Sequence, residues 1–492
     1  MSEPMLDRII SYMSPERGLK RKTLRAKEQI LKRFYDGAEY GKRAKNFYAP
    51  KTSANTENRF GLPIRDRARD LVRNNPYAHA ALRAIVHSTV GVGIRPQIRC
   101  ESPVKRERIK SLWKEWAEST AIDYEGQKDF YQIQSMVMRT VVESGECLVR
   151  IRKGKTDSLI PFSLQVLEPD FLDSTREYRI SENSYVIQGI EIQNNQVAAY
   201  WLYPEHPGDA VNTTYSGISQ RIPAEEILFI RRQERPGQLR SVSWFHPCLL
   251  ALRDLFEYQS TILYQQKLSN CFSVFIRNPD LSVDPLSSTE QEELKELSPG
   301  LIYKLAIGED VQFAAPPAPS TSYNEYCNHI LRSIATSLGI TFEMLNQDYS
   351  TVNYSSGRMG HLQMSQNIDS WRWQMLIPQL CLPVWDLFER GLTIQGIDLS
   401  DLEVSYTPPR REMLNVSEET ESIKEAMRCG LMTLSEALRE LGEDPQSHLE
   451  ELASDFKTLK QLGLRLECDP SQDSKPGSSQ APLQSQEAAH AS

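Results

Sequence analysis

The sequence predicts an α+β protein: a largely antiparallel sheet, long helices on either side of it in the chain, and a purely helical C-terminal part. Three observations lead to this fold class. Segments rich in β-branched and aromatic residues cluster between residues 147 and 231. Before and after this block, apolar residues recur at the three-to-four spacing of amphipathic helices. From about residue 414 to residue 462 only helical patterns occur, separated by glycines that are typical helix stops.

Size and composition set the outer limits. A chain of 492 residues can bury a large core and is expected to divide into roughly three domains. Hydrophobic content of 40% and charged content of 25% are typical of a soluble globular protein. No apolar stretch reaches the length that a membrane helix needs, and the N-terminus has no apolar secretory core. We therefore expect a protein that folds in a cytoplasm and has no membrane partner.

Charge and cysteine spacing narrow the function classes. The net charge of −8 argues against a general basic surface that grips nucleic acid, although it permits DNA to slide past. Basic residues still crowd an N-terminal arm between Arg17 and Arg33. We interpret this arm as a solvated helix over about 21–34, with contact to an acidic partner or DNA as the alternative. None of the eight cysteines lies within four residues of another, so their spacing encodes neither a zinc knuckle nor a redox pair.

Helices are expected on both sides of a short turn in the first part of the chain. The helical pattern starts at Asp66, is interrupted by Pro76 and continues from residue 80 to residue 89. Gly91 and Gly93 follow; we interpret them as a turn, because neither a lysine-serine tail nor a third glycine completes a phosphate loop. At Ile94 the chain enters strand-like sequence. Two further helices are predicted over 106–119 and 130–144.

Strands are predicted over 147–152, 163–167, 185–192, 197–203 and 227–231 because these segments are rich in β-branched and aromatic residues. Asn194 and Asn195 are a good hairpin turn between the third and fourth of them.

Two long helices are then expected to bracket a small inserted module. The first runs from about residue 249 to 269, and the second from 323 to 338, where Gly339 stops it. The module of about 50 residues between them is predicted to contain strands over 272–276, 300–304 and 310–314 and a helix over 289–297. The sequence thus predicts a helical hairpin with a small domain at its tip.

The segment Asn346–Ser356 is a polar loop between two helical patterns. It carries one carboxylate, two tyrosines and no lysine or arginine. Such loops are often functional, although turns are built from the same residue types. The helix after it is predicted over 358–390, with kinks at Pro378 and Pro383, and a strand over 402–406.

The C-terminal helices are predicted from their start and stop signals. Ser417 is expected to cap a helix that ends at Gly430, and Thr433 with Glu436 to form a capping box for the next, with a third over 447–462. The tail after residue 469 is predicted to be disordered.

The sequence contains no recognisable catalytic motif. No two of the eight histidines have metal-ligand spacing, and no nucleophile elbow or phosphate-binding lysine loop occurs. A run of carboxylates at the predicted 289–297 helix is favoured as a helix-dipole feature over a metal site: Glu290, Glu292, Glu293 and Glu296. We expect no enzymatic activity, no metal and no cofactor; a nuclease fused to a structural domain stays as a rival interpretation.

Several segments, in order and spacing over roughly residues 60 to 410, resemble the lambda-type portal proteins of tailed bacteriophages. They are Arg69 to Ala78, Val90 to Ile94, Gly145-Glu146, Leu167 to Asp170, Arg235 to Gln238 with Arg240, Leu338 to Ile340, Asp348 to Ser350, and Asn353 to Ser356. One departure is Ser241, where the family usually has glycine, which puts a local turn in doubt. The first fifty residues and the tail are matched poorly.

The resemblance implies a portal-like architecture with named parts. The implied parts are a basic N-terminal arm (1–60), an α+β wing (61–246), a stem helix (247–270), a small α/β clip (271–320) inserted before a second stem helix (321–342), a tunnel loop (343–357), a wing helix and strand (358–413), a helical crown (414–468) and a disordered tail (469–492).

The resemblance also implies a function. Similar proteins form a ring of about twelve subunits at one capsid vertex, through which double-stranded DNA is packaged and later leaves. Implied partners are other copies of the chain, the large terminase subunit, the major capsid and scaffold proteins, and head-completion or tail adaptor proteins; the implied location is the virion, after assembly in the bacterial cytoplasm. A non-enzymatic head–tail adaptor or structural ring protein is the alternative.

Two sets of residues are candidate contacts on this interpretation. The clip carboxylates Glu290, Glu292, Glu293 and Glu296 would meet a partner. The tunnel loop would narrow the DNA channel with Gln347, Asp348, Tyr349, Ser350, Thr351, Val352, Asn353 and Tyr354. Because this loop has no lysine or arginine, it could touch DNA without trapping it. Tyr349 and Tyr354 fit equally well against the duplex or against neighbouring helices.

Overall fold

The computed structural model describes residues 14–15, 20, 51–153, 160–209, 218–270, 274–277, 310–313, 323–350, 352–409 and 415–464. The chain divides into two units, residues 1–57 and 58–492. In the first, the short helix α3 (Ala54–Glu57) is described. The predicted arm helix over 21–34, the module elements over 289–297 and 300–304, and the tail lie outside the described residues. Among the described helices, none combines the length and apolar character required to cross a membrane.

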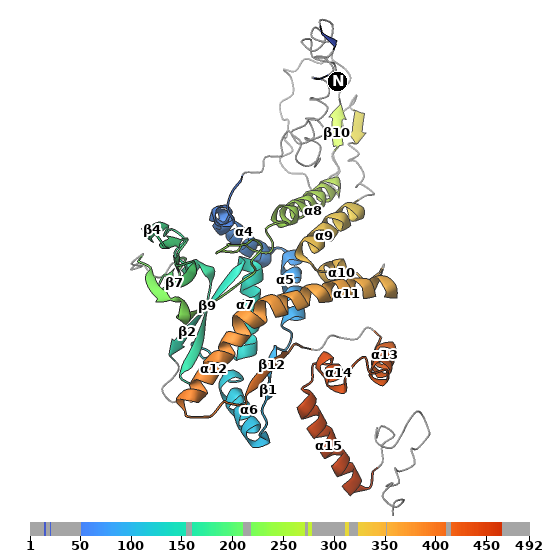
Figure 1. Cartoon of the computed structure of the whole chain (residues 1–492). Coiled ribbons are helices and arrows are strands. Elements are labelled where there is room, and N and C mark those ends of the chain that lie inside the picture. The colour runs from blue at the N-terminus through green and yellow to red at the C-terminus, as the bar shows by residue number, and fades with distance from the viewer. Residues whose placement is uncertain are drawn as a thin grey trace, which may run out of the picture. The chain divides into compact units, whose positions relative to one another are not determined.

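After a 3-10 helix (Asn58–Phe60), the second unit continues with two consecutive helices, α4 (Gly61–Asn74) and α5 (Pro76–Thr89) (Figure 1). The two helices and the interruption between them were predicted, but α4 begins five residues before the predicted start at Asp66. Asn75 ends one and starts the other, because its side-chain oxygen accepts hydrogen bonds from the N–H groups of Tyr77 and Ala78 at 2.9 and 3.1 Å. The glycines after α5 form the predicted turn: Gly91 has a φ of +52° and Gly93 one of +107°.

A three-stranded sheet lies beside the next helices. The helix α6 (Pro103–Ala117) is followed by α7 (Phe130–Ser144), which matches its predicted range. The strand β2 (Glu146–Lys153) pairs antiparallel with β3 (Phe162–Leu167) on one side and β9 (Ile227–Arg231) on the other. The antiparallel sheet expected in this block is therefore confirmed, but it is divided into two.

The second sheet has five strands in sequence order, β4 (Tyr178–Ser181), β5 (Ser184–Ile187), β6 (Ile190–Gln193), β7 (Gln196–Leu202) and β8 (Gln220–Pro223). The prediction of one strand over 185–192 is wrong. Gln188 and Gly189 both have positive φ values, 49° and 80°, and turn the chain back within that run. The Asn194–Asn195 hairpin turn is confirmed by φ values of 49° and 63°.

Two short strands, β4 and β8, were not predicted, whereas the strand-like sequence predicted after the glycine turn is confirmed. β1 (Arg95–Arg99) follows the glycine turn and pairs antiparallel with β12 (Glu403–Thr407), more than 300 positions later in the sequence, so that Gln97 faces Ser405. The first strand of this pair, Arg-Pro-Gln-Ile-Arg, was predicted only as strand-like sequence without bounds, because it has little apolar alternation.

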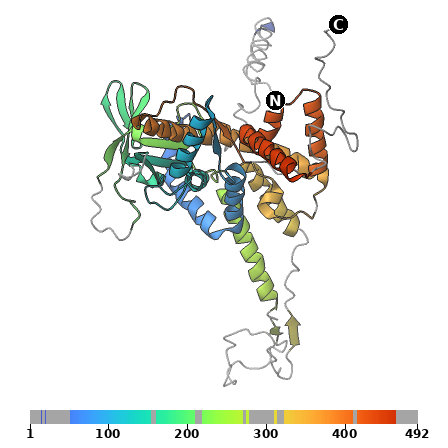
Figure 2. The ribbon, with the colours of Figure 1, turned by 90° about the horizontal axis from the view of Figure 1, so that it is seen from below.

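The helices predicted on either side of the inserted module are confirmed. α8 (Leu249–Asn270) and α9 (Tyr323–Leu338) lie side by side (Figures 1 and 2), with the Tyr258 ring 5.8 Å from that of Tyr323 and 4.8 Å from that of Tyr326. Between them in the chain, β10 (Val274–Arg277) pairs antiparallel with β11 (Asp310–Phe313). Gly339 ends α9 with a φ of +71°.

The long helical run after the polar loop has an unexpected middle. It consists of α11 (Tyr354–Trp371), a π-helical segment (Arg372–Cys381) and α12 (Leu382–Ile394). The kink predicted at Pro378 thus takes the form of ten π-helical residues, whose wider turns accommodate the missing proline N–H. At its start, the buried Arg372 donates to the carbonyls of Ser88 and Thr89 at 2.8 and 2.7 Å and so caps α5.

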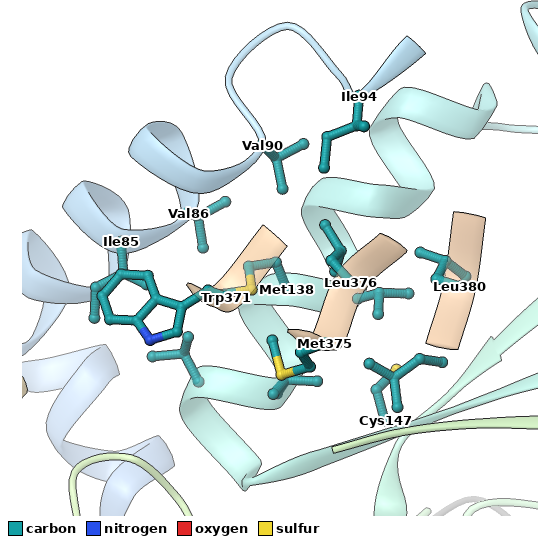
Figure 3. Close-up of a cluster of buried hydrophobic side chains, with 14 of the residues drawn as sticks. Ile85, Val86, Val90, Ile94, Met138, Cys147, Trp371, Met375, Leu376 and Leu380 are labelled. Atoms are coloured by element: carbon teal, nitrogen blue, oxygen red, sulfur yellow. The ribbon is translucent and has the colours of Figure 1, made fainter. Parts of the chain in front are cut away.

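The main core lies where this run crosses α5 and α7. Figure 3 shows side chains from four elements facing one another there: Ile85 and Val86 of α5, Met138 of α7, Cys147 of β2, and Trp371, Met375, Leu376 and Leu380 of the long run. Burial at this crossing fixes the position of α11 relative to α5.

Three helices follow, α13 (Val416–Arg428), α14 (Leu434–Glu440) and α15 (Pro445–Leu462). The predicted cap at Ser417 is wrong, because Asn415 accepts from the N–H of Glu418 instead. Half of the predicted capping box is present, since Thr433 accepts from the N–H of Glu436 at 3.1 Å. α15 is held to α6 by an ion pair of 2.7 Å between Arg106 and Glu450.

Candidate functional site

The polar loop is shorter than predicted because helices extend into it from both sides. The helix α10 (Phe342–Asn346), which the sequence analysis missed, follows α9 after a Thr341 cap. Gln347 ends it in the left-handed conformation, with φ +56° and its N–H bonded to Glu343 O. At the other end Asn353 caps α11 through a reciprocal capping box with Ser356. The loop proper is therefore residues 347–353.

The loop has its own local order and presents polar groups to solvent. The Asp348 carboxylate accepts from the N–H of Ser350 at 3.0 Å. Hydrogen bonding by the Ser350 hydroxyl and by this N–H lowers the pKa of Asp348, so its carboxylate is charged at neutral pH. Tyr349 is 63% exposed, so its ring is available to a molecule outside the chain. Thr351 lies outside the described residues.

Tyr354 differs from the other residues predicted for this site. It is the first residue of α11, and its hydroxyl donates to Glu418 at 3.3 Å, so it links the start of α11 to α13. Its side chain is 48% exposed. The structure thus brings together the described residues from Gln347 to Asn353 at one loop and assigns Tyr354 to the helix behind it.

The clip carboxylates Glu290, Glu292, Glu293 and Glu296 lie outside the described residues, so their arrangement stays a prediction.

A buried charge cluster, which the sequence analysis did not identify, joins several of the family-like segments. Glu146 heads β2 with its side chain fully buried. It accepts from Arg65 Nη2 at 3.2 Å, from Arg240 Nε at 2.6 Å and from the Ser241 N–H at 2.9 Å. Burial lowers the pKa of Arg65 against the attraction of Glu146. The cluster ties α4, the sheet and the segment after β9 together.

Ser241 fits this cluster without strain. Its φ is not positive, so the position does not require the glycine usual in the family. Its backbone N–H binds Glu146, and its hydroxyl donates to the carbonyl of Arg232 at 2.8 Å. The turn that this departure put in doubt is therefore formed. By contrast, Gly145 has a φ of +94°, and a Cβ there would lie 2.5 Å from the carbonyl oxygen of Val242.

A second group of ionisable side chains lies at the edge of the same cluster. Glu168, Asp170 and His206 offer oxygen and nitrogen atoms within 4.8 Å of one another. Arg69 occupies this group, however, at 2.9 Å from Glu168 and 2.6 Å from Asp170. Burial raises the pKa of Asp170, but the Arg69 hydrogen bond and the nearby guanidinium charges outweigh it and keep that pKa below its ordinary value. An arginine-neutralised pair of carboxylates is a poor cation site.

Two features could have been found in the sequence. Glu146 is a lone carboxylate at the head of an apolar strand, and Arg65 and Arg69 are spaced to lie on one face of α4. Such charges are buried only when they are paired, so they predict one another.

A comparison with known protein families decides to which family the chain belongs. The family model described as phage portal protein, lambda family, matches residues 40–372. The chain belongs to the lambda family of phage portal proteins.

Known portal proteins match over much of their length. A probable portal protein of Halomonas phage phiHAP-1 is 24% identical over 424 residues, covering 82% of this chain and 81% of the relative. Portal protein B of Escherichia phage lambda is 23% identical over 331 residues, covering 59% of this chain and 62% of the relative. A chain from the neck of a native GTA particle, solved with C12 symmetry, is 13% identical with a TM-score of 0.45. The match covers 76% of this chain and 93% of the GTA chain.

Membership decides the broad function. The chain is a phage portal protein, and portal proteins as a family are structural components that form oligomeric rings. As a family they are not enzymes. The chain itself has a mixed helix and sheet fold.

Proposed function

We propose that copies of this chain close into a ring of about twelve subunits and that the loop 347–353 lines the narrowest part of the DNA channel. The observation that carries the assignment is the form of the loop. It is held between two capped helices, α10 and α11, and the base of α11 is fixed in the main core. A loop on such a support can project into a channel without collapsing.

The chemistry of the loop supports passage of DNA. Between Asn346 and Ser356 there is one carboxylate and no lysine or arginine. Each cation held against the DNA backbone adds salt-dependent affinity, so a lining of amides, hydroxyls and one negative charge interacts only weakly with phosphates. The exposed Tyr349 ring is the largest side chain that the loop offers to a duplex.

The remaining parts are proposed from the family resemblance and the element order. The α+β block within 61–246, together with 358–413, would form the wing, and α8 and α9 the two stem helices of 247–270 and 321–342. The module at 271–320 would be the clip, and α13, α14 and α15 the crown. The packing of Tyr258 on Tyr323 and Tyr326 supports a stem of two paired helices.

The proposed partners follow from these parts. The clip, with Glu290, Glu292, Glu293 and Glu296, would meet the large terminase subunit during packaging and head-completion or tail adaptor proteins afterwards. The outer surface would meet the major capsid and scaffold proteins during assembly in the host cytoplasm, and the finished ring would occupy the portal vertex of the virion.

The test deletes residues 348–352, which spares both helix caps, Gln347 and Asn353. We expect rings of normal size and a marked loss of packaged or retained DNA, measured as the fraction of DNA-filled heads. A deletion of the same length and similar composition, residues 211–215 between β7 and β8 in the chain, should leave filling unchanged. Normal filling by the 348–352 deletion would remove the channel assignment.

A further inference from the structure

A hollow beside the loop 347–353 is lined by positively charged side chains, whereas the loop itself carries one carboxylate and no lysine or arginine. It has a volume of about 580 Å³ and lies where α4 meets α5 and α10 ends. Its polar lining comes from Arg73, Tyr77, His79, Arg83 and the amides of Asn74, Asn75, Asn346 and Gln347. None of the described residues that line it carries a carboxylate. The hollow therefore joins two cations and several amide groups at the base of the proposed channel loop.

The two guanidinium groups are available to a ligand. Arg73 and Arg83 are both exposed, and within the described part of the chain neither lies within 4.0 Å of a carboxylate oxygen. The fold holds their positions: Asn75 caps α5 between them, and Asp70 accepts a hydrogen bond of 2.7 Å from Asn74. The N-terminal end of α5 also opens at this hollow, and its dipole adds to the positive potential.

We propose that this hollow binds backbone phosphates of the DNA in the channel, through Arg73 and Arg83. The inference rests on the proposed channel position of the loop, because Gln347 belongs both to the loop and to the lining of the hollow. Guanidinium groups match phosphate oxygens in geometry and charge, and amide groups add hydrogen bonds. An acidic surface of a neighbouring subunit is the competing occupant. The phosphate is favoured because the loop beside the hollow is the part of the chain proposed to face DNA.

The consequence is a division of roles between two adjacent surfaces. The loop guides DNA with little attraction, whereas the hollow supplies a limited, salt-sensitive hold on DNA that has stopped moving. Two contacts per subunit change affinity moderately. With a slope of about −0.9 per phosphate contact, each contact lowers affinity about 3.5-fold between 50 and 200 mM salt, and two contacts lower it about 12-fold.

The test measures binding of a short DNA duplex to assembled rings of the full chain at several salt concentrations. For the double variant Arg73→Gln, Arg83→Gln, we expect intact rings and weaker binding at 50 mM salt. The loss of affinity between 50 and 200 mM should be at least about 12-fold smaller than for the unmodified rings. The double variant Arg73→Lys, Arg83→Lys keeps both charges and should retain most of the salt dependence. The matched control Arg67→Gln, Arg108→Gln removes two exposed cations outside the hollow and should bind like the unmodified rings.

Three results would overturn the inference. An unchanged salt slope in intact Arg73→Gln, Arg83→Gln rings would show that the hollow does not meet DNA. Failure of this variant to form rings, while the lysine and control variants do, would assign the hollow to subunit contact. An equal effect of the Arg67→Gln, Arg108→Gln control would reduce the effect to net charge. If the inference fails while the 348–352 deletion still impairs filling, the channel assignment stands; if unmodified chains form no rings, the proposed function itself fails.

Discussion

The buried charge cluster around Glu146 gives the most quantitative prediction. The change is Glu146→Gln, which keeps the size of the side chain and removes its charge. In the structure this carboxylate is fully buried and compensates two guanidinium groups, those of Arg65 and Arg240, whose side chains are only 4% and 6% exposed. Removing one partner of a buried ion pair leaves uncompensated charge and costs about 3–5 kcal/mol.

Two measurements check this prediction: the free energy of unfolding of the whole protein, and the hydrogen-exchange protection of one amide at the site. Urea unfolding should show a loss of about 3–5 kcal/mol. Hydrogen exchange should show that the Ser241 amide, which donates to Glu146 at 2.9 Å, loses on the order of 100-fold or more of its protection, because 1.4 kcal/mol corresponds to a factor of ten.

The matched control is Glu425→Gln. Glu425 pairs with Arg428 at 3.5 Å, but both side chains are more than half exposed, at 62% and 53%. Exposed pairs of this kind are worth about 0.3–0.5 kcal/mol. A Glu146→Gln cost below about 1 kcal/mol, or one equal to that of the control, would refute the conclusion that the cluster holds α4, the sheet and the segment after β9 together.

Three further predictions test other parts of the fold and site. Gly145→Ala should lower the free energy of unfolding in urea by about 2–5 kcal/mol, because it adds left-handed backbone strain and a clash with the Val242 backbone. Gly396→Ala, at a position with φ +74° and open space around it, should cost only about 1–2 kcal/mol. Equal costs would contradict the clash. The pKa of Asp170 is lowered in the folded state, so the charged carboxylate stabilises the fold above its unfolded pKa of about 3.9, and this stabilisation is lost as pH falls through the lower folded value. Asp170→Asn should therefore flatten the decline of the unfolding free energy below about pH 4. An unchanged pH profile would contradict this. Tyr349→Lys adds a cation to every copy of the loop and should steepen the salt dependence of DNA binding to rings. Ile180→Lys, at an exposed strand position, should not change this dependence. An equal salt dependence of the two variants would argue against a channel position for the loop.

The sequence predicted elements well where apolar periodicity is strong, and less well where short polar segments decide the structure. The range of α7 was predicted correctly, and so was that of α9, because apolar stripes and glycine stops mark them. The pairing of β1 could not be predicted, because its partner β12 lies far away in the sequence. The short helix α10 was hidden because its five residues carry little periodic signal.

The polar loop was predicted from the sequence and is present, although shorter, but the surroundings of this loop required the fold. Nothing in the local sequence shows that Arg73 and Arg83 lie beside Gln347, since the hollow forms only when α10 packs against α5. The contact from Tyr354 to Glu418 likewise depends on how α13 folds back to the start of α11. The resemblance to portal proteins, by contrast, was visible in the sequence and is confirmed by the family match over residues 40–372.

The central claim is that this loop borders a channel enclosed by copies of the chain. A three-dimensional electron microscopy reconstruction of the purified full-length protein tests it most directly. The account predicts closed rings with an axial opening wide enough for a DNA duplex, in which residues 347–353 of every subunit form the narrowest constriction. Closed rings whose constriction is formed by other residues, or particles without an axial opening, would contradict it.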